Sequence, residues 1–278
     1  MKRRVNMLAK YKAAIVILFL FCVSCEKDDH YEPDGQTDKF EVRLKSVVWE
    51  NLPSPFYHFV YSNDGFVTQF SFASGLKQYL ISYDDGLIRE VKNTVGPAKD
   101  KLVYEYAGDK VELIKYVNEA GEIFKRCFLD YNVNGQLISI EWEVKLAAGF
   151  QASRTLTFAY RDDGNLFEMK DHRFEIAGRH PELILIDRYL DYDSKVTADS
   201  RTLIHPVDDD MVLLPRVKLQ KNNPRKVIRS GMGANYDVDY TYTYNAQNQP
   251  TLKAGDALFT SGPQAGTRFQ FKVEFSYW

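Results

Sequence analysis

A short phrase recurs along the chain: an alternating segment ends in tyrosine, a turn rich in Asp or Asn with a glycine follows, and an apolar residue opens the next segment. Asn and Asp tolerate the left-handed backbone conformation, and glycine adopts positive φ without a Cβ clash. Such turns between alternating segments are a strong local signal for β-hairpins. Clear copies begin at Tyr61, Tyr83, Tyr131 and Tyr160, and weaker ones at Tyr106 and Tyr244. The chain is therefore expected to consist of successive antiparallel hairpins.

The segments between these turns alternate with a period of two. In residues 269–277, Phe and Val alternate with Gln, Lys, Glu and Ser, the pattern of an antiparallel strand with one face in water. Helical periodicity is nearly absent, and the high aromatic content of 14% favours strands. We predict an all-β fold, a single large and strongly curled antiparallel sheet of about 14 to 16 strands.

Two segments leave alternatives open. Residues 180–190 (HPELILIDRYL) fit either a short helix beginning at Pro181 or a buried strand. Residues 193–223 are polar and irregular, and they form either a long loop or the boundary between two halves of one sheet. No Ser/Gly-rich linker separates independent domains.

The N-terminus has the pattern of an export signal. Basic residues precede the nine apolar residues 13–21, which are too few for a membrane-spanning helix of about 20 residues. We expect a signal peptide over residues 1–24, a polar tether over 25–38 and a β domain over 39–278. Removal of the signal and modification of Cys25 would leave Cys127 as the remaining free thiol, so no intramolecular disulfide is expected.

The residues around Cys25 resemble a bacterial lipobox. Val23, Ser24 and Cys25 match it, whereas Cys22 stands where Leu is preferred. The resemblance implies cleavage before Cys25 and a diacylglycerol on its thiol. The EKDD that follows resembles the Lys-plus-acidic export signal of surface lipoproteins in the Bacteroidota, which implies an outer-membrane lipoprotein on the cell-surface side. The alternative is an acidic tether that only keeps the segment soluble.

The hairpin phrases resemble the YD repeats of Rhs-type proteins, which form long antiparallel β ribbons. The chain also resembles a Bacteroidota lipoprotein family of unknown function with a porin-like fold. That resemblance rests on the lipobox, the Tyr-Gly hairpins, the Lys-Asn-Asn-Pro of residues 221–224 and the Tyr-rich segment 236–245. It implies a porin-like or partial-barrel sheet, and it implies no activity.

The sequence offers little catalytic chemistry. The charge is nearly balanced, 36 Lys and Arg against 38 Asp and Glu, so a nucleic-acid partner is not expected. The sequence has no nucleophile-elbow, phosphate-loop or dinucleotide motif, and we expect no cofactor, no catalytic residue and no enzyme. Asp208, Asp209 and Asp210 are candidate calcium ligands, although three consecutive acidic residues rarely all face one ion and a solvated acidic loop is the more common explanation.

Aromatic side chains are the other candidate site residues. Trp49 and Trp142 are able to stack on a sugar if they are exposed, and the alternative is that they pack the interior. The terminal Trp278 resembles the end of an outer-membrane barrel, but polar residues on the wet faces argue against a lipid-facing wall. We therefore predict a lipid-anchored envelope protein that binds or scaffolds a glycan or an envelope protein. The alternative is an envelope hydrolase with its site in the concave face of the sheet.

Overall fold

The computed structural model describes residues 42–96, 99–198, 202–204 and 210–278, all within one compact unit, Gln36–Trp278. The expected signal peptide and tether lie outside the described residues, as do Cys25, Asp208 and Asp209. No helix among the described residues is long and apolar enough to cross a membrane.

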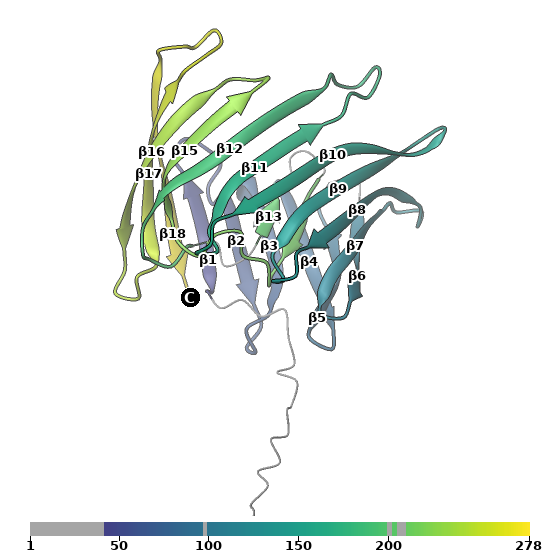
Figure 1. Cartoon of the computed structure of the whole chain (residues 1–278). Coiled ribbons are helices and arrows are strands. Elements are labelled where there is room, and N and C mark those ends of the chain that lie inside the picture. The colour runs from purple at the N-terminus through teal and green to yellow at the C-terminus, as the bar shows by residue number, and fades with distance from the viewer. Residues whose placement is uncertain (1–41, 97–98, 199–201, 205–209) are drawn as a thin grey trace, which may run out of the picture. The chain divides into compact units, whose positions relative to one another are not determined.

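Sixteen antiparallel strands form one closed barrel, and two further strands form a separate small sheet (Figure 1). The barrel strands are β1 (Leu44–Trp49), β2 (Tyr57–Tyr61), β3 (Val67–Phe72), β4 (Lys77–Asp84), β5 (Leu87–Asn93), β6 (Lys101–Ala107), β7 (Lys110–Val117), β8 (Ile123–Tyr131), β9 (Leu137–Leu146), β10 (Gly149–Tyr160), β11 (Leu166–Arg173), β12 (Leu183–Tyr192), β15 (Pro224–Gly231), β16 (Tyr236–Tyr244), β17 (Pro250–Phe259) and β18 (Arg268–Tyr277). The small sheet pairs β13 (Thr202–Ile204) with β14 (Val212–Leu214), and a short 3₁₀ turn, η1 (Ala73–Gly75), joins β3 to β4.

The structure confirms the predicted all-β fold and adds the closure that the sequence left open. β18 returns to pair with β1, so that Val47 lies opposite Phe275. Every other barrel strand pairs with its neighbour along the barrel order, and β12 pairs with β15 across the long connection between them. Residues 183–192 are therefore a strand, and not a helix.

The segment between β12 and β15 enters the barrel interior. Residues 210–214, here called the plug, have buried side chains, and those of residues 211–214 belong to the same apolar core as inward-facing residues of the wall. The Tyr104 hydroxyl donates to the carbonyl oxygen of Leu213 at 3.0 Å and accepts from the Leu213 N–H at 3.3 Å. Of the two alternatives for residues 193–223, the long loop is correct, and part of that loop fills the barrel (Figure 1).

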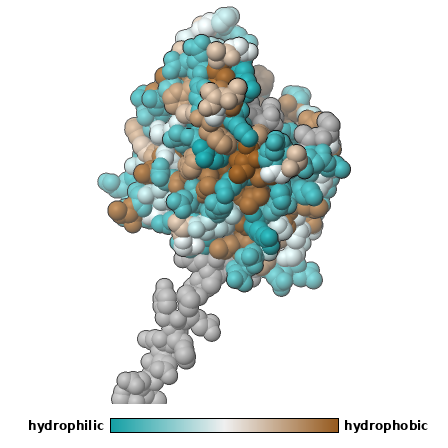
Figure 2. Space-filling model, turned by 90° about the vertical axis from the view of Figure 1, so that its right-hand side faces the viewer, coloured by the Kyte–Doolittle hydropathy of each residue, from teal (hydrophilic) through white to brown (hydrophobic). Residues whose placement is uncertain are grey.

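The outer wall is polar. Charged side chains that alternate with the buried ones form ion pairs between neighbouring strands around much of the circumference. These pairs are Lys101–Glu90, Lys115–Glu105, Arg126–Glu143, Arg188–Glu168, Lys226–Asp239 and Arg268–Asp256. Figure 2 shows one side of the barrel, where hydrophilic residues surround a smaller hydrophobic area.

Seven tyrosines, four of them from the repeated phrase, form one rim of the barrel, here called the tyrosine rim. Each lies at or near the end of a strand and donates its hydroxyl to a backbone carbonyl at or next to the start of the strand before it, at 2.6 to 3.0 Å. The pairs are Tyr61–Leu44, Tyr83–Val67, Tyr106–Ile88, Tyr160–Leu137, Tyr192–Leu166, Tyr242–Pro224 and Tyr277–Pro250. Each tyrosine thus ties one turn of this rim to the next.

Asparagines hold both ends of the long connection at the tyrosine rim. The Asn165 side-chain oxygen accepts the N–H groups of Lys221 and Asn222 at 2.9 and 3.0 Å. The N–H of Asn223 donates to the carboxylate of Asp193 at 3.2 Å. The Lys-Asn-Asn-Pro segment therefore fixes the point at which the chain leaves the interior and resumes the wall at β15.

Candidate functional site: a cavity at the barrel mouth

A cavity of about 510 Å³ lies at the rim opposite the tyrosine rim. Its wall comes from the ends of β8 to β12 that are remote from the tyrosine rim, together with the loop 174–182 that joins β11 to β12. Its floor includes Asp210 of the plug. The lining residues are Lys125, Val144, Ser153, Arg154, Arg173, Ile176, Arg179, His180, Pro181, Glu182, Leu183, Asp210 and Met232.

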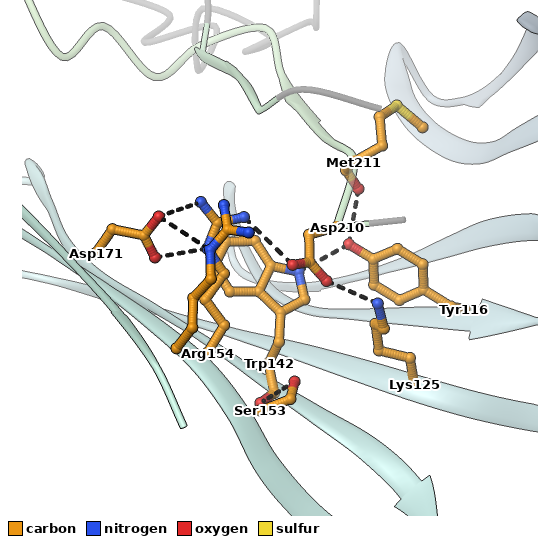
Figure 3. Close-up of polar contacts among 9 residues, drawn as sticks. Tyr116, Lys125, Trp142, Ser153, Arg154, Asp171, Asp210 and Met211 are labelled. Carbon is orange, nitrogen blue, oxygen red and sulfur yellow. Dashed lines mark hydrogen bonds and ion pairs between the residues drawn. The ribbon is translucent and has the colours of Figure 1, made fainter. Parts of the chain in front are cut away.

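The floor is a compact network of charges (Figure 3). The Asp210 carboxylate lies 2.7 Å from Nζ of Lys125 and 3.2 Å from the guanidinium of Arg154. Arg154 also donates two hydrogen bonds of 2.8 Å to Asp171. These side chains are only 9 to 12% exposed, and charges so far from water are tolerated when each is paired and hydrogen-bonded. The network therefore holds the plug against the wall.

An aromatic pair lies beside this network. The Nε1–H of Trp142 donates to the Tyr116 hydroxyl at 3.0 Å, and that hydroxyl donates to the carbonyl oxygen of Met211 at 2.7 Å. The guanidinium of Arg154 lies 5.2 Å from the Trp142 ring centroid. Burial is the main cause that raises the pKa of Tyr116 well above its ordinary value. Tyr116 therefore acts here as a neutral hydrogen-bonding group.

The loop 174–182 forms the open side of the cavity. Ile176 is 5% exposed and is joined to His180 by an isolated β-bridge, so the loop folds over the barrel mouth. The His172 ring lies 2.7 Å from the Glu182 carboxylate. Arg179 is exposed on this loop, and its guanidinium makes no ion pair with any residue that the structure describes. The loop thus places an uncompensated positive charge at the cavity.

The structure separates the residues that the sequence singled out. Trp142 is 0% exposed and lies behind the cavity floor. Trp49 is half-buried and stacks on Phe271, with ring centroids 5.7 Å apart. Neither tryptophan lines the cavity, and Trp142 has no exposed surface to offer a ligand here.

Asp210 is the described member of the predicted acidic cluster, and it is an ion-pair partner of Lys125 and Arg154. Among the described residues, no group of three or more His, Cys, Asp or Glu side chains is placed to hold a metal ion. Asp208 and Asp209 lie outside those residues, so calcium binding by the cluster stays a prediction.

Apart from Asp210, the charged residues of the cavity were not predicted from the sequence, although a signal for two of them exists. In β10, Arg154 lies on the same face as the buried Leu156 and Phe158, because alternate residues of a strand share a face. In β8, Lys125 shares a face with Cys127 in the same way. A charge on the inward face of a predicted strand needs a partner or a function. Arg179 carries no such signal, because it lies in an irregular loop.

Comparison with known proteins identifies the fold. No known family's sequence profile matches the chain, and no curated protein matches it. A porin-like protein from Bacteroides uniformis matches with a TM-score of 0.55 and 14% identity, over 85% of this chain and 95% of that one. A porin-like protein from Bacteroides vulgatus matches with a TM-score of 0.53 and 11% identity, over 85% and 99%. The fold is porin-like. At these identities the likeness concerns the porin-like architecture alone.

Proposed function

We propose that this chain is a lipid-anchored envelope protein whose barrel stands in water and binds a ligand, and that it does not conduct solutes across a bilayer. The observation that carries the proposal is the polarity of the barrel, which has charge outside and an apolar core inside. A membrane-spanning porin has the opposite arrangement, an apolar outer band around a polar lumen.

The outer ion pairs argue against contact with lipid. Lys or Arg at the middle of a bilayer costs roughly 2 to 4 kcal/mol on a barrel wall. The wall carries such residues on many strands, for example Lys115 on β7, Arg188 on β12 and Lys226 on β15. The combined cost of such residues would be comparable to the whole stability of an ordinary domain, about 5 to 15 kcal/mol.

The filled interior argues against transport. Leu213 of the plug is 0% exposed, and it packs in one core with Ile114 and Ile140 of the wall. A passage for solutes would require an open, water-filled lumen. The interior of this barrel functions as a core, as in small barrels whose side chains fill the inside.

Anchoring is proposed from Cys25 and the acidic residues after it. Lipidation would hold the barrel at the outer membrane through the tether, and the EKDD segment would direct it to the cell surface. The origin of the two similar structures in Bacteroides is consistent with this location. Replacement Cys25→Ser is expected to release the protein from the membrane fraction, and unchanged association would contradict the proposed anchor.

The cavity at the barrel mouth supports binding as the activity. The ligand classes we propose are a glycan or an envelope protein. The alternative of an envelope hydrolase gains no specific support, because Asp171 and Asp210 are both engaged by Arg154, whereas glycoside hydrolysis needs two carboxylates free to face the substrate.

The proposal is tested with the chain from Gln36 onward, which is one compact unit. We expect it to purify as a folded protein without detergent, to leave the conductance of a planar lipid bilayer unchanged and to bind members of a glycan array. A requirement for detergent together with stepwise conductance would overturn it. An array without binders would move the assignment to a protein partner.

A further inference from the structure

We propose that the mouth cavity binds a sugar acid, with the ligand's carboxylate held by the guanidinium of Arg179 above the charged floor. This inference rests on the proposed function, namely that the barrel is a binding module. It adds the chemical class of the ligand and the residue that recognises it.

The cavity has the size and the lining of a small-molecule site. Its volume of about 510 Å³ falls within the range of roughly 300 to 1,000 Å³ typical of such sites. Apolar groups of Val144, Ile176 and Leu183 form part of the lining, and polar groups occupy the floor and the loop. Apolar walls with a few directed polar groups suit a sugar ring, which has apolar faces and a polar edge.

Among the described residues, the lining carries more cationic side chains than carboxylates. It contains four cationic side chains, from Lys125, Arg154, Arg173 and Arg179, and two carboxylates, from Asp210 and Glu182. Asp171, behind the wall, binds Arg154 and lies 3.4 Å from Nε of Arg173. Lys125, Arg154 and Arg173 are all engaged by partners, so Arg179 supplies the positive charge that favours an anionic ligand.

Arg179 is the cation of this set that a ligand can reach without breaking an ion pair between described residues. Lys125 and Arg154 already hold the plug, whereas Arg179 is exposed and has no ion-pair partner among the described residues. A guanidinium presents parallel N–H donors that match the two oxygens of a carboxylate. A phosphate or a free dicarboxylate offers similar oxygens, but neither has a ring to cover the apolar wall.

Four small molecules distinguish a sugar acid from a neutral sugar, a dicarboxylate and a phosphate as the ligand. Isothermal titration of the chain from Gln36 compares D-glucuronate with D-glucose, succinate and inorganic phosphate at low salt. We expect glucuronate to bind at least about tenfold more tightly than glucose, because a charge-assisted hydrogen bond contributes roughly a factor of ten or more. Succinate and phosphate should also bind less tightly than glucuronate, because they have no ring to cover the apolar wall. Binding should weaken as the salt concentration rises.

Variants locate the site. Arg179→Glu is expected to weaken glucuronate binding by at least about tenfold, and Arg179→Lys by less, because lysine keeps the charge but loses the fork. Arg89→Glu is the matched control, because Arg89 is exposed on β5 and does not line the cavity, and it should bind like wild type. Thermal unfolding of each variant verifies the fold, and Arg179→Ala is the second variant if the glutamate is not tolerated.

Equal binding of glucose, or tighter binding of phosphate or succinate, would overturn the sugar-acid assignment. Unchanged glucuronate binding by folded Arg179→Glu or Arg179→Ala would overturn the site. If no probe bound while the glycan array returned neutral glycans, this inference would fail and the proposed binding function would stand. An array without binders, together with no probe binding, would also end this inference and leave a protein partner for the proposed function, whereas a requirement for detergent together with stepwise conductance would remove both.

Discussion

The hydroxyl of Tyr83 donates a hydrogen bond of 2.8 Å to the backbone carbonyl oxygen of Val67, sixteen positions earlier. The same relationship recurs from turn to turn along the rim, for example from Tyr160 to Leu137 and from Tyr242 to Pro224. It gives a physical reason for the recurrent tyrosine, because phenylalanine would supply the same ring without the donor. The repeated phrase therefore encodes both the hairpin turn and a tie to the previous turn.

Replacement Tyr83→Phe should destabilise the barrel at neutral pH. It removes one hydrogen bond and leaves the carbonyl of Val67, a residue that is 0% exposed, with one bond fewer, so we expect a loss of about 1 to 2 kcal/mol in the free energy of unfolding. Denaturant titration followed by tryptophan fluorescence measures it.

The control for this prediction is Tyr189→Phe. The Tyr189 hydroxyl makes no hydrogen bond with any described residue, so its removal should change the free energy of unfolding by less than about 0.5 kcal/mol. Equal effects of the two replacements would show that the tyrosine-rim bonds do not contribute to stability.

The parts of this fold that could be predicted from the sequence are those that depend on residues close together in the chain. The turn at Asp85 and Gly86 and the alternation in β18 depend on neighbouring residues, and both were predicted. Closure was not, because it depends on strand number, tilt and register around the whole sheet, and the deciding pair joins Val47 to Phe275. The cavity was missed for the same reason, since Asp210 and Lys125 are 85 positions apart.

The burial of the plug could not be predicted from neighbouring residues either. Its flanking residues are polar and irregular, which is typical of a surface loop. Its burial depends on partners far along the chain, such as Tyr104, which is 109 positions from Leu213. A buried segment of this kind is recognisable only when the wall around it is known.

Replacement Asp210→Asn should loosen the plug. It keeps the shape of the side chain but removes the negative charge that compensates Lys125 and Arg154, and breaking a largely buried pair costs roughly 3 kcal/mol or more. The thiol of Cys127 provides a local readout, because Cys127 is 0% exposed and burial raises its pKa. We expect a thiol reagent to label Cys127 faster in the variant than in wild type.

Asp256→Asn is the matched control for the plug. It breaks an Asp–Arg pair with Arg268 on the outer wall, where the two side chains are 38% and 62% exposed. Exposed pairs contribute about 0 to 1 kcal/mol, so labelling of Cys127 should stay at the wild-type rate. Slow labelling in Asp210→Asn, with unchanged unfolding, would mean that the charge network does not hold the plug.

Gly231 at the end of β15 should not tolerate a side chain. Its φ is +137°, and a Cβ atom there would lie 2.1 Å from the carbonyl oxygen of Ile184. Gly149 has a comparable φ of +123° with no atom within 4 Å of the corresponding Cβ position. Gly231→Ala should therefore lower the free energy of unfolding by clearly more than Gly149→Ala, which carries the backbone strain of about 1 to 3 kcal/mol alone. Equal losses would show that β12 moves aside without cost.

Alkaline pH should destabilise the barrel through its buried tyrosines. Burial raises the pKa of Tyr116 well above that of an unfolded tyrosine, so in the alkaline range the folded state retains a proton that the unfolded state has lost. The free energy of unfolding should therefore be insensitive to this group below about pH 10 and fall above it, by about 1.4 kcal/mol per pH unit for each such group.

Denaturant titrations between about pH 8 and pH 11 measure this slope, and Tyr116→Phe isolates the contribution of one residue. The variant loses the hydrogen bonds to Trp142 and Met211 at every pH, so its stability is lower throughout. Its decline above about pH 10 should nevertheless be shallower than that of wild type, because one titrating group has been removed. Parallel declines would mean that Tyr116 ionises in the folded state as readily as in the unfolded chain.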